Sequence, residues 1–136
     1  MFVSEGREPV LTSKAPKPIG PYSQAIRTEA MVFASGQAGI DPATGELVQG
    51  GVEAETRQTL TNIRNVLEAS DSGMAFVVKT TVFLIDMNDF AKMNAIYAEF
   101  FPKDPPARST VAVAALPKGA RVEIEATAVQ QSPHGD

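Results

Sequence analysis

The chain has 136 residues and a formal net charge of −4, with 43% hydrophobic and 21% charged residues. This length predicts one domain with a substantial core, and the acidic balance argues against a broad basic surface for nucleic acid. There is no cysteine, and His134 is the single histidine. Disulfides, thiolate nucleophiles, metal centres built on cysteine or histidine, and catalytic triads are therefore excluded. We expect no metal or other cofactor, and the chemistry must use arginine, lysine, carboxylates, hydroxyls and backbone groups.

Three regions are distinguished by composition. Residues 1–14 are predicted to be an N-terminal extension that can be flexible, residues 15–130 a single domain, and residues 131–136 a polar C-terminal tail. The first residues include acidic side chains and no apolar run long enough for a secretory or membrane segment. We therefore expect a cytoplasmic protein that does not bind membranes.

The first half of the domain predicts a hairpin, a loop and a helix. Extended-type runs on either side of the polar turn 27–30 predict two strands between Ser23 and Gln37. The next segment, 39–51, concentrates Asp-Pro, Thr-Gly and Gly-Gly, which is turn chemistry, and has room for only a short strand at 46–48. Apolar residues at helical spacing predict the first helix over 52–69.

The second half predicts a strand over 76–85, where β-branched and aromatic residues dominate. A second helix is predicted over 86–101, with Asp86 or Asn88 as its cap. Two further strands, 109–116 and 121–129, flank the turn Pro-Lys-Gly-Ala and predict a hairpin. The expected order is β-β-α-β-α-β-β in the α+β class.

Right-handed crossovers place both helices on one side of a single sheet and leave the other side uncovered. In the central strand, alternation puts one apolar set on each side of the sheet: Thr81, Phe83 and Ile85 on one, and Val78, Val82 and Leu84 on the other. An uncovered apolar face of this kind is unusual for a soluble monomer. We expect a homo-oligomer whose sheets face one another across a symmetry axis.

Arg108 stands alone at the head of the run "RSTVAVAALP", directly behind a proline pair, and no further charge follows until Lys118. Its guanidinium can bind a carboxylate or phosphate in a bidentate way, and Pro105 and Pro106 stiffen the backbone that presents it. Two interpretations remain open: Arg108 anchors a small anionic ligand, or it pairs with a surface carboxylate at an interface.

Several weaker signals accompany Arg108. Glu123 and Glu125 alternate with apolar residues in the last strand and are either solvated or, if partly buried by assembly, able to orient water or exchange a proton. Tyr22 and Ser35 offer hydroxyl groups, and Gly36 allows close approach to the main chain.

If the last two strands form a tight hairpin, Arg108 and Glu123 lie on one face about 20 Å apart, too far for one small ligand. The site then draws on neighbouring subunits, or the hairpin does not form.

The segments "IGPYSQAI", "ASGQAGIDPATGELVQGGV", "VVKTTVFLIDMNDFAKMNAIYAEFF" and "PPARSTVAVAALPKGARVEIEATAV" together resemble the Rid (YjgF) family of enamine/imine deaminases, from about Ala15 to Val129. The resemblance implies a chorismate-mutase-like subunit, a homotrimer with a central barrel, and ligand clefts between subunits. It also implies roles for individual residues: catalytic Arg108, Glu123 and Tyr22, and substrate contacts from Arg108, Ser35, Gly36, Thr110 and Asn94. We interpret Asn94 as supporting structure. Thr110 stands where many bacterial members carry cysteine.

The implied function is hydrolysis of reactive 2-imino or 2-enamino acids to 2-keto acids and ammonia, with small imino and keto acids as ligands and no nucleic acid partner. Non-catalytic binding of keto acids, or a chaperone-like role, remains an alternative. Ribonuclease or translation-inhibitor activity, which has been attached to relatives, is disfavoured by the acidic balance of the chain and by the lack of a catalytic histidine. Chorismate mutase-like chemistry is a further alternative that the shared fold permits without proving.

Overall fold

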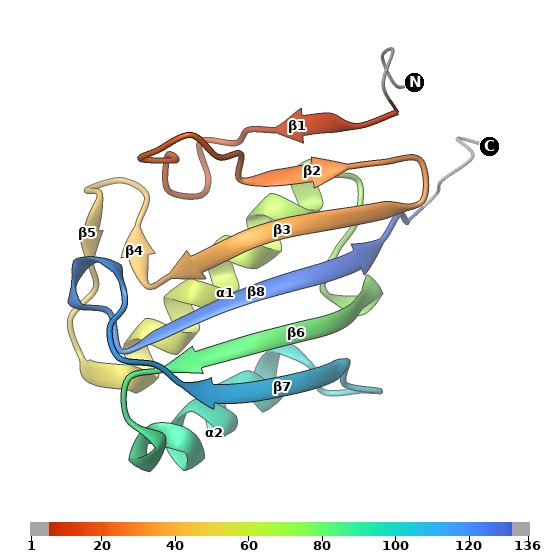
Figure 1. Cartoon of the computed structure of the whole chain (residues 1–136). Coiled ribbons are helices and arrows are strands. Elements are labelled where there is room, and N and C mark those ends of the chain that lie inside the picture. The colour runs from red at the N-terminus through yellow and green to blue at the C-terminus, as the bar shows by residue number, and fades with distance from the viewer. Residues whose placement is uncertain (1–5, 132–136) are drawn as a thin grey trace.

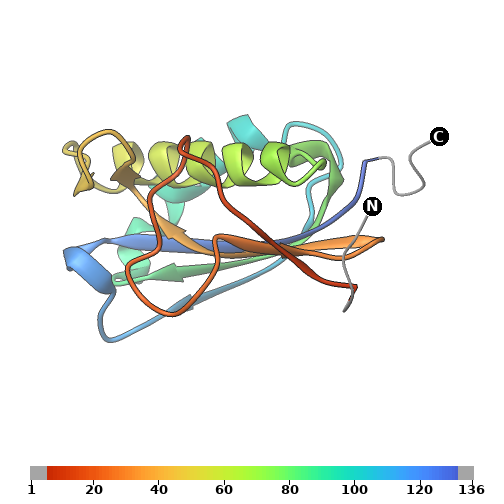
Figure 2. The same ribbon diagram turned by 90° about the horizontal axis from the view of Figure 1, so that it is seen from above.

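Two helices cover one face of a six-stranded sheet, as a computed structural model that describes residues 6–131 shows (Figures 1 and 2). The helices are α1 (Gly51–Ala69) and α2 (Phe90–Phe100). In spatial order the strands of the sheet are β1 (Glu8–Val10), β2 (Ala25–Arg27), β3 (Met31–Ala38), β8 (Val122–Val129), β6 (Val77–Leu84) and β7 (Ala107–Ala112). The predicted α+β class, with a mixed sheet and both helices on one side, is confirmed.

The core lies between α1 and the centre of the sheet. The apolar residues that predict the first helix are the ones that α1 buries, among them Leu60, Ile63, Val66 and Leu67, each at most 1% exposed. They meet the inward-facing residues of β3, β6 and β8, which include Val82 and Ile124. The helical spacing of these residues therefore sets which face of α1 packs on the sheet.

Three short strands are additions to the predicted order. β1 lies within the expected N-terminal extension and pairs antiparallel with β2 of the domain. The first five residues of this extension lie outside the described part of the chain. The expected loop carries a two-stranded hairpin of β4 (Ile40–Asp41) and β5 (Glu46–Leu47), which includes the short strand expected at 46–48. His134 and the rest of 132–136 also lie outside the described residues.

The predicted hairpin between the last two strands is wrong. β7 pairs in parallel with β6, from Lys79↔Ala107 to Leu84↔Ala112, and β8 pairs with the other edge of β6. The β6–α2–β7 crossover explains this arrangement, because it brings β7 alongside β6 and leaves the opposite edge to β8. The turn residues 117–119 form a 3₁₀ turn in a longer connection.

The side predicted for Val78 is also wrong. The register of β6 against β8 shifts between Val77 and Lys79, so one extra residue interrupts the alternation. As a result Val77 is buried and Val78 is 44% exposed, whereas Val82 and Leu84 are buried as expected.

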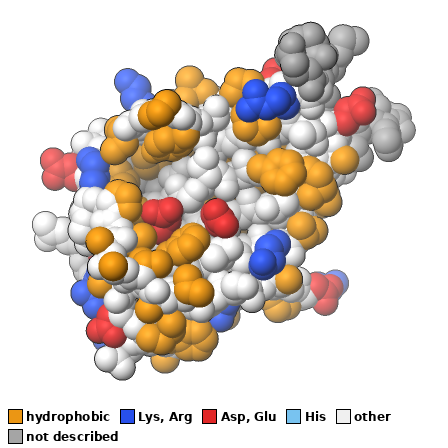
Figure 3. All heavy atoms as spheres, in the orientation of Figure 1, with side chains coloured by type: hydrophobic (Ala, Val, Ile, Leu, Met, Phe, Trp, Pro, Cys, Tyr) orange, Lys and Arg blue, Asp and Glu red, His pale blue; other side chains and the backbone are white. Residues whose placement is uncertain are grey.

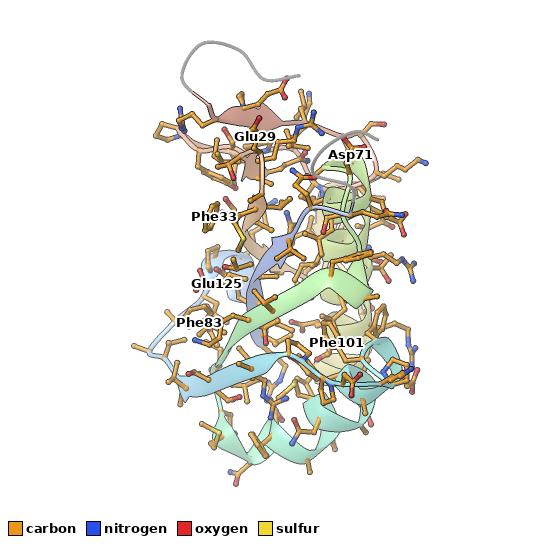
Figure 4. All side chains as sticks on the ribbon, turned by 90° about the vertical axis from the view of Figure 1, so that its right-hand side faces the viewer. Glu29, Phe33, Asp71, Phe83, Phe101 and Glu125 are labelled. Atoms are coloured by element: carbon orange, nitrogen blue, oxygen red, sulfur yellow. The ribbon has the colours of Figure 1, made fainter. Side chains whose placement is uncertain are left out.

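The sheet face opposite the helices, which carries Phe33, Phe83, Glu123 and Glu125, is here called the open face. Phe33 is 48% exposed, and Figure 4 shows Phe33, Phe83 and Glu125 pointing away from the helices. In the view of this face in Figure 3, acidic side chains lie near the middle with hydrophobic ones around them. Within residues 6–131, no helix combines the length and apolar character needed to cross a bilayer.

Candidate functional site

A groove of about 680 Å³ brings together Tyr22, Ser35, Gly36 and Glu123, four of the predicted site residues. Its walls are the loop before β2, the end of β3, the β4–β5 hairpin, the 3₁₀ turn 117–119 and the first half of β8. Glu125 also lines it. Residues that lie far apart in the sequence thus meet where β3 ends and β8 begins.

Glu123 is the half-buried carboxylate of this groove, and Glu125, two residues further along the same strand face, is exposed. Burial, reinforced by the negative charge of Glu125, raises the pKa of Glu123 above that of an ordinary glutamate. A half-buried carboxyl group with a raised pKa keeps its proton to higher pH than an ordinary glutamate does, which suits it to proton exchange.

Gly36 lies directly beneath the Glu123 carboxylate. A Cβ built at Gly36 would lie 2.2 Å from Glu123 Oε2 and 2.9 Å from its Cδ. The register of β3 against β8 shifts between Ala34 and Gln37, which marks a bulge at this point. Only glycine leaves room for the carboxylate to rest against the main chain here.

Ser35 and Tyr22 hold the neighbouring wall. The Ser35 hydroxyl donates to the Ser23 carbonyl at 2.6 Å, and the Ser35 N–H donates to the Gln24 carbonyl at 2.9 Å. The Tyr22 side chain is 51% exposed, and its hydroxyl accepts the Ile19 N–H at 3.4 Å. Because its proton is engaged, the Ser35 hydroxyl offers its lone pairs to the groove, whereas Tyr22 retains its own proton to donate.

Arg108 forms a second cluster, with aromatic rings of α2, at the β7 edge of the sheet, where β7 also carries Thr110 and α2 carries Asn94. Arg108 is in register with Thr80, a buried residue that contacts Tyr97 of α2, so the Arg108 side chain lies on the helix side. Its guanidinium carbon is 4.7 Å from the centroid of the Tyr97 ring and 5.6 Å from that of Phe90. Thr110 follows two residues later on the same strand face, and the buried Asn94 Oδ1, on α2 between the two rings in sequence, has no hydrogen-bond partner within the described structure.

The tight hairpin that would place Arg108 and Glu123 on one sheet face does not form. Arg108 is paired with Thr80 and Glu123 with Phe83, and these two β6 residues point to opposite sides of the sheet. One chain therefore carries an arginine cluster and a glutamate groove that cannot contact the same small ligand.

A family profile described as Endoribonuclease L-PSP (Ribonuc_L-PSP) matches residues 12–130. The chain belongs to this family. It is the Rid (YjgF) family to which the sequence motifs pointed, so the predicted family is confirmed.

Two solved structures and one curated protein illustrate the relationship. A protein from Bos taurus named 2-iminobutanoate/2-iminopropanoate deaminase is 52% identical over 91% of this chain and 90% of its own length. The crystal structure of the YjgF gene product from E. coli has a TM-score of 0.87 and 44% identity, covering 91% of this chain and 99% of that one. E. coli TdcF, solved with bound serine, has a TM-score of 0.87 and 40% identity over 91% and 99% of the two chains.

Sequence reasoning missed one organising residue of this Rid family groove, Gln24. Its buried side chain accepts the Thr12 N–H at 2.7 Å and donates to the carbonyls of Thr12, Ala15 and Pro16. These bonds fix the loop that forms one wall. The sequence feature that could have identified Gln24 is its position inside the motif "GPYSQA", where a glutamine directly precedes a strand.

Two lysines of the groove were also missed. Lys17 lines the groove, as does Lys118, whose ammonium donates to the Gly45 carbonyl at 2.9 Å. Among residues 6–131 no three His, Cys, Asp or Glu side chains are grouped as ligands for a metal ion.

Proposed function

We propose that the chain hydrolyses 2-imino acids, and the enamines in equilibrium with them, to 2-keto acids and ammonia. The observation that carries the proposal is the pair of complementary clusters, a half-buried glutamate with a raised pKa over Gly36 and an arginine held on aromatic rings. The name of the bovine relative supports the reaction, and the serine bound to TdcF supports a small ligand that carries a carboxylate.

In this mechanism Arg108 binds the substrate carboxylate, aided by the Gly36 amide and by the Tyr22 hydroxyl, while Ser35, whose hydroxyl donates to the Ser23 carbonyl, shapes the wall of the groove. Glu123 accepts a proton from a water molecule as that water adds to the C=N carbon. The same proton passes to the nitrogen, which gives a carbinolamine. A second proton, from the new hydroxyl group, then moves through Glu123 to the nitrogen, so that the C–N bond breaks and ammonia leaves behind a keto group. An imine is already electrophilic, so positioning together with proton transfer, typically worth about 10²- to 10⁴-fold, accounts for the catalysis.

The active unit of this proposal is a homotrimer whose sites lie between subunits. Because Arg108 and Glu123 lie on opposite sheet faces, the arginine edge of one subunit must meet the groove of another. An inward-turned open face would also cover Phe33, which is 48% exposed, and Val111, which is 42% exposed. Thr110 shapes the pocket beside Arg108, and Asn94 supports the helix beneath it. The cytoplasmic location stays a prediction from the sequence.

The test generates iminopropanoate in the assay with an amino-acid oxidase and measures how much the protein diverts from semicarbazide to pyruvate. Arg108→Ala and Glu123→Gln are expected to lower this diversion at least about 100-fold. Arg64→Ala is the matched control, because it removes another arginine held over an aromatic ring, 5.7 Å from the Phe100 centroid, outside both clusters. Equal diversion by the wild type and Arg108→Ala would refute the assignment.

The wild type and the Arg108→Ala variant also distinguish the deaminase from a binding protein and from a ribonuclease. A keto acid that binds without turnover would favour a binding protein, and RNA cleavage that persists in Arg108→Ala would favour the endoribonuclease after which the family profile is described.

Mixing tests the shared site directly. Arg108→Ala and Glu123→Gln subunits, each expected to be at least about 100-fold less active alone, are unfolded together and refolded as mixed trimers. About one site in four then combines an intact arginine with an intact glutamate, so about a quarter of the wild-type activity is expected. No recovery, in trimers verified by native mass measurement, would contradict a site between subunits.

A further inference from the structure

The Arg108 guanidinium is held by aromatic rings and not by an acid. It lies 4.7 Å from the Tyr97 ring centroid and 5.6 Å from that of Phe90, both in α2. By contrast, none of the ion pairs found within residues 6–131 includes Arg108. The cation is therefore positioned without being neutralised.

Tyr97 is the better fixed of the two rings. It is 6% exposed, and its hydroxyl is 2.6 Å from the Thr80 hydroxyl in a buried hydrogen bond. Thr80 is the register partner of Arg108 across β6 and β7. The tyrosine is thus tied to the neighbouring strand at the same level as the arginine that rests on it. Phe101 packs on its ring, with 4.7 Å between centroids.

This arrangement suits an arginine that must bind an anion. A free arginine samples many rotamers, and a carboxylate partner would restrict them only by occupying the donors that a ligand needs. An aromatic face contacts the flat side of the guanidinium and leaves its N–H edges available for a bidentate carboxylate.

We propose that Tyr97, anchored by Thr80, is a positioning residue that holds Arg108 in place for the carboxylate of the substrate. The inference rests on the proposed function for its ligand, but the restraint on Arg108 is a property of the single chain. Burial raises the pKa of Tyr97, against the lowering effects of the Thr80 hydrogen bond and of the charge and hydrogen bonding of Arg108, so the phenol stays neutral beside the cation.

The first experiment does not depend on activity. The mobility of the Arg108 side chain is measured by NMR relaxation of its Nε–H group in the wild type, Tyr97→Leu, Thr80→Val and Phe100→Leu. Phe100→Leu is the matched control, since it removes another aromatic ring of α2, one that packs against the core and whose centroid lies 5.7 Å from the guanidinium carbon of Arg64. We expect Arg108 to become mobile in Tyr97→Leu, to be partly mobilised in Thr80→Val, and to be unchanged in Phe100→Leu. An Arg108 that stays rigid in folded Tyr97→Leu would overturn the proposal.

The second experiment is a double-mutant cycle in the deaminase assay. Tyr97→Leu should raise KM about 5- to 30-fold with little change in kcat, the range that a partly to fully desolvated cation–π contact supports. In an Arg108→Ala background the same change should have no further effect on KM. An equal rise of KM in both backgrounds would mean that Tyr97 acts on the fold and not through Arg108.

Side-chain mobility and deaminase activity also test the role of Tyr97 and the proposed function separately. A wild type without deaminase activity would defeat the proposed function, and the mobility of Arg108 would still decide the role of Tyr97. Tyr97→Phe, which keeps the ring and loses the bond to Thr80, provides a variant that folds if Tyr97→Leu does not, and the same two measurements apply to it. We expect it to mobilise Arg108 as far as Thr80→Val does, and rigidity equal to the wild type would count against the anchor.

Discussion

Replacing Gly36 by alanine tests whether the position of the Glu123 carboxylate matters for catalysis. The added Cβ would lie 2.2 Å from Glu123 Oε2, and an ordinary contact begins near 3.4 Å, so the carboxylate must withdraw by about 1 Å. A displacement of this size at a reacting group costs about 100-fold. We therefore expect kcat to fall about 100-fold in the imine assay. KM should change little, because Arg108 and the backbone amide of residue 36 are retained.

Two other glycines provide controls for Gly36→Ala. Gly73→Ala should have no effect on either activity or stability, because its Cβ would be 3.8 Å from the nearest atom, on Phe76. Gly39→Ala should instead destabilise the fold by about 1–3 kcal/mol, since its Cβ would be 2.8 Å from the backbone of Glu55 in α1, which cannot yield as a side chain can. The free energy of unfolding of Gly36→Ala itself should lie within about 1 kcal/mol of the wild-type value. Wild-type kcat in folded Gly36→Ala would refute a role for the carboxylate at this position.

Three further changes have defined outcomes. Glu125→Gln removes a charge that raises the pKa of Glu123, so the acid limb of the kcat/KM profile against pH should move to lower pH. Burial raises the pKa of Glu55, so the folded state binds more protons than the unfolded state above pH 4.5 and loses stability as pH rises through this window. Denaturant titrations should accordingly find that Glu55→Gln, which can still accept the Arg121 N–H, gains stability over the wild type as pH rises toward neutrality. An unchanged difference across pH would contradict this reasoning. Leu60→Ala, at a fully buried position, should cost about 2–5 kcal/mol in the same titrations, and a loss below about 1 kcal/mol would show that the site collapses around the smaller side chain.

Local sequence patterns predicted where the helices and strands of this fold lie better than they predicted which strands pair with one another. The spacing of Leu60, Ile63 and Leu67 fixed the buried face of α1, because helical periodicity is a property of the segment itself. The pairing of β7 with β6 depends on how α2 packs on the sheet and so on where the chain after α2 enters it. No short stretch of sequence contains this information. The turn residues Pro117 and Gly119 suggested a hairpin and instead form a 3₁₀ turn in a longer connection.

In the candidate site, too, individual residues could be predicted but their arrangement in space could not. Glu123, Gly36, Ser35 and Tyr22 could be named from motifs, and they do line one groove. Their distance from Arg108 could not be predicted, because it depends on the insertion of β6 between β7 and β8. The side on which Val78 lies was unpredictable for a related reason, since one extra residue between Val77 and Lys79 puts the start of β6 out of step with the alternation of the rest of the strand.

The position of β8 has a consequence for how the molecule is made. This strand is the last in sequence, yet it lies between β3 and β6, and its pairs with β3 join residues that are about ninety positions apart in the chain. Before β8 is in place, the ribbon of β1 to β3 and the β6–β7 pair share no hydrogen-bonded strand. The groove is lined by β8, so it cannot form before this strand pairs with β3 and β6.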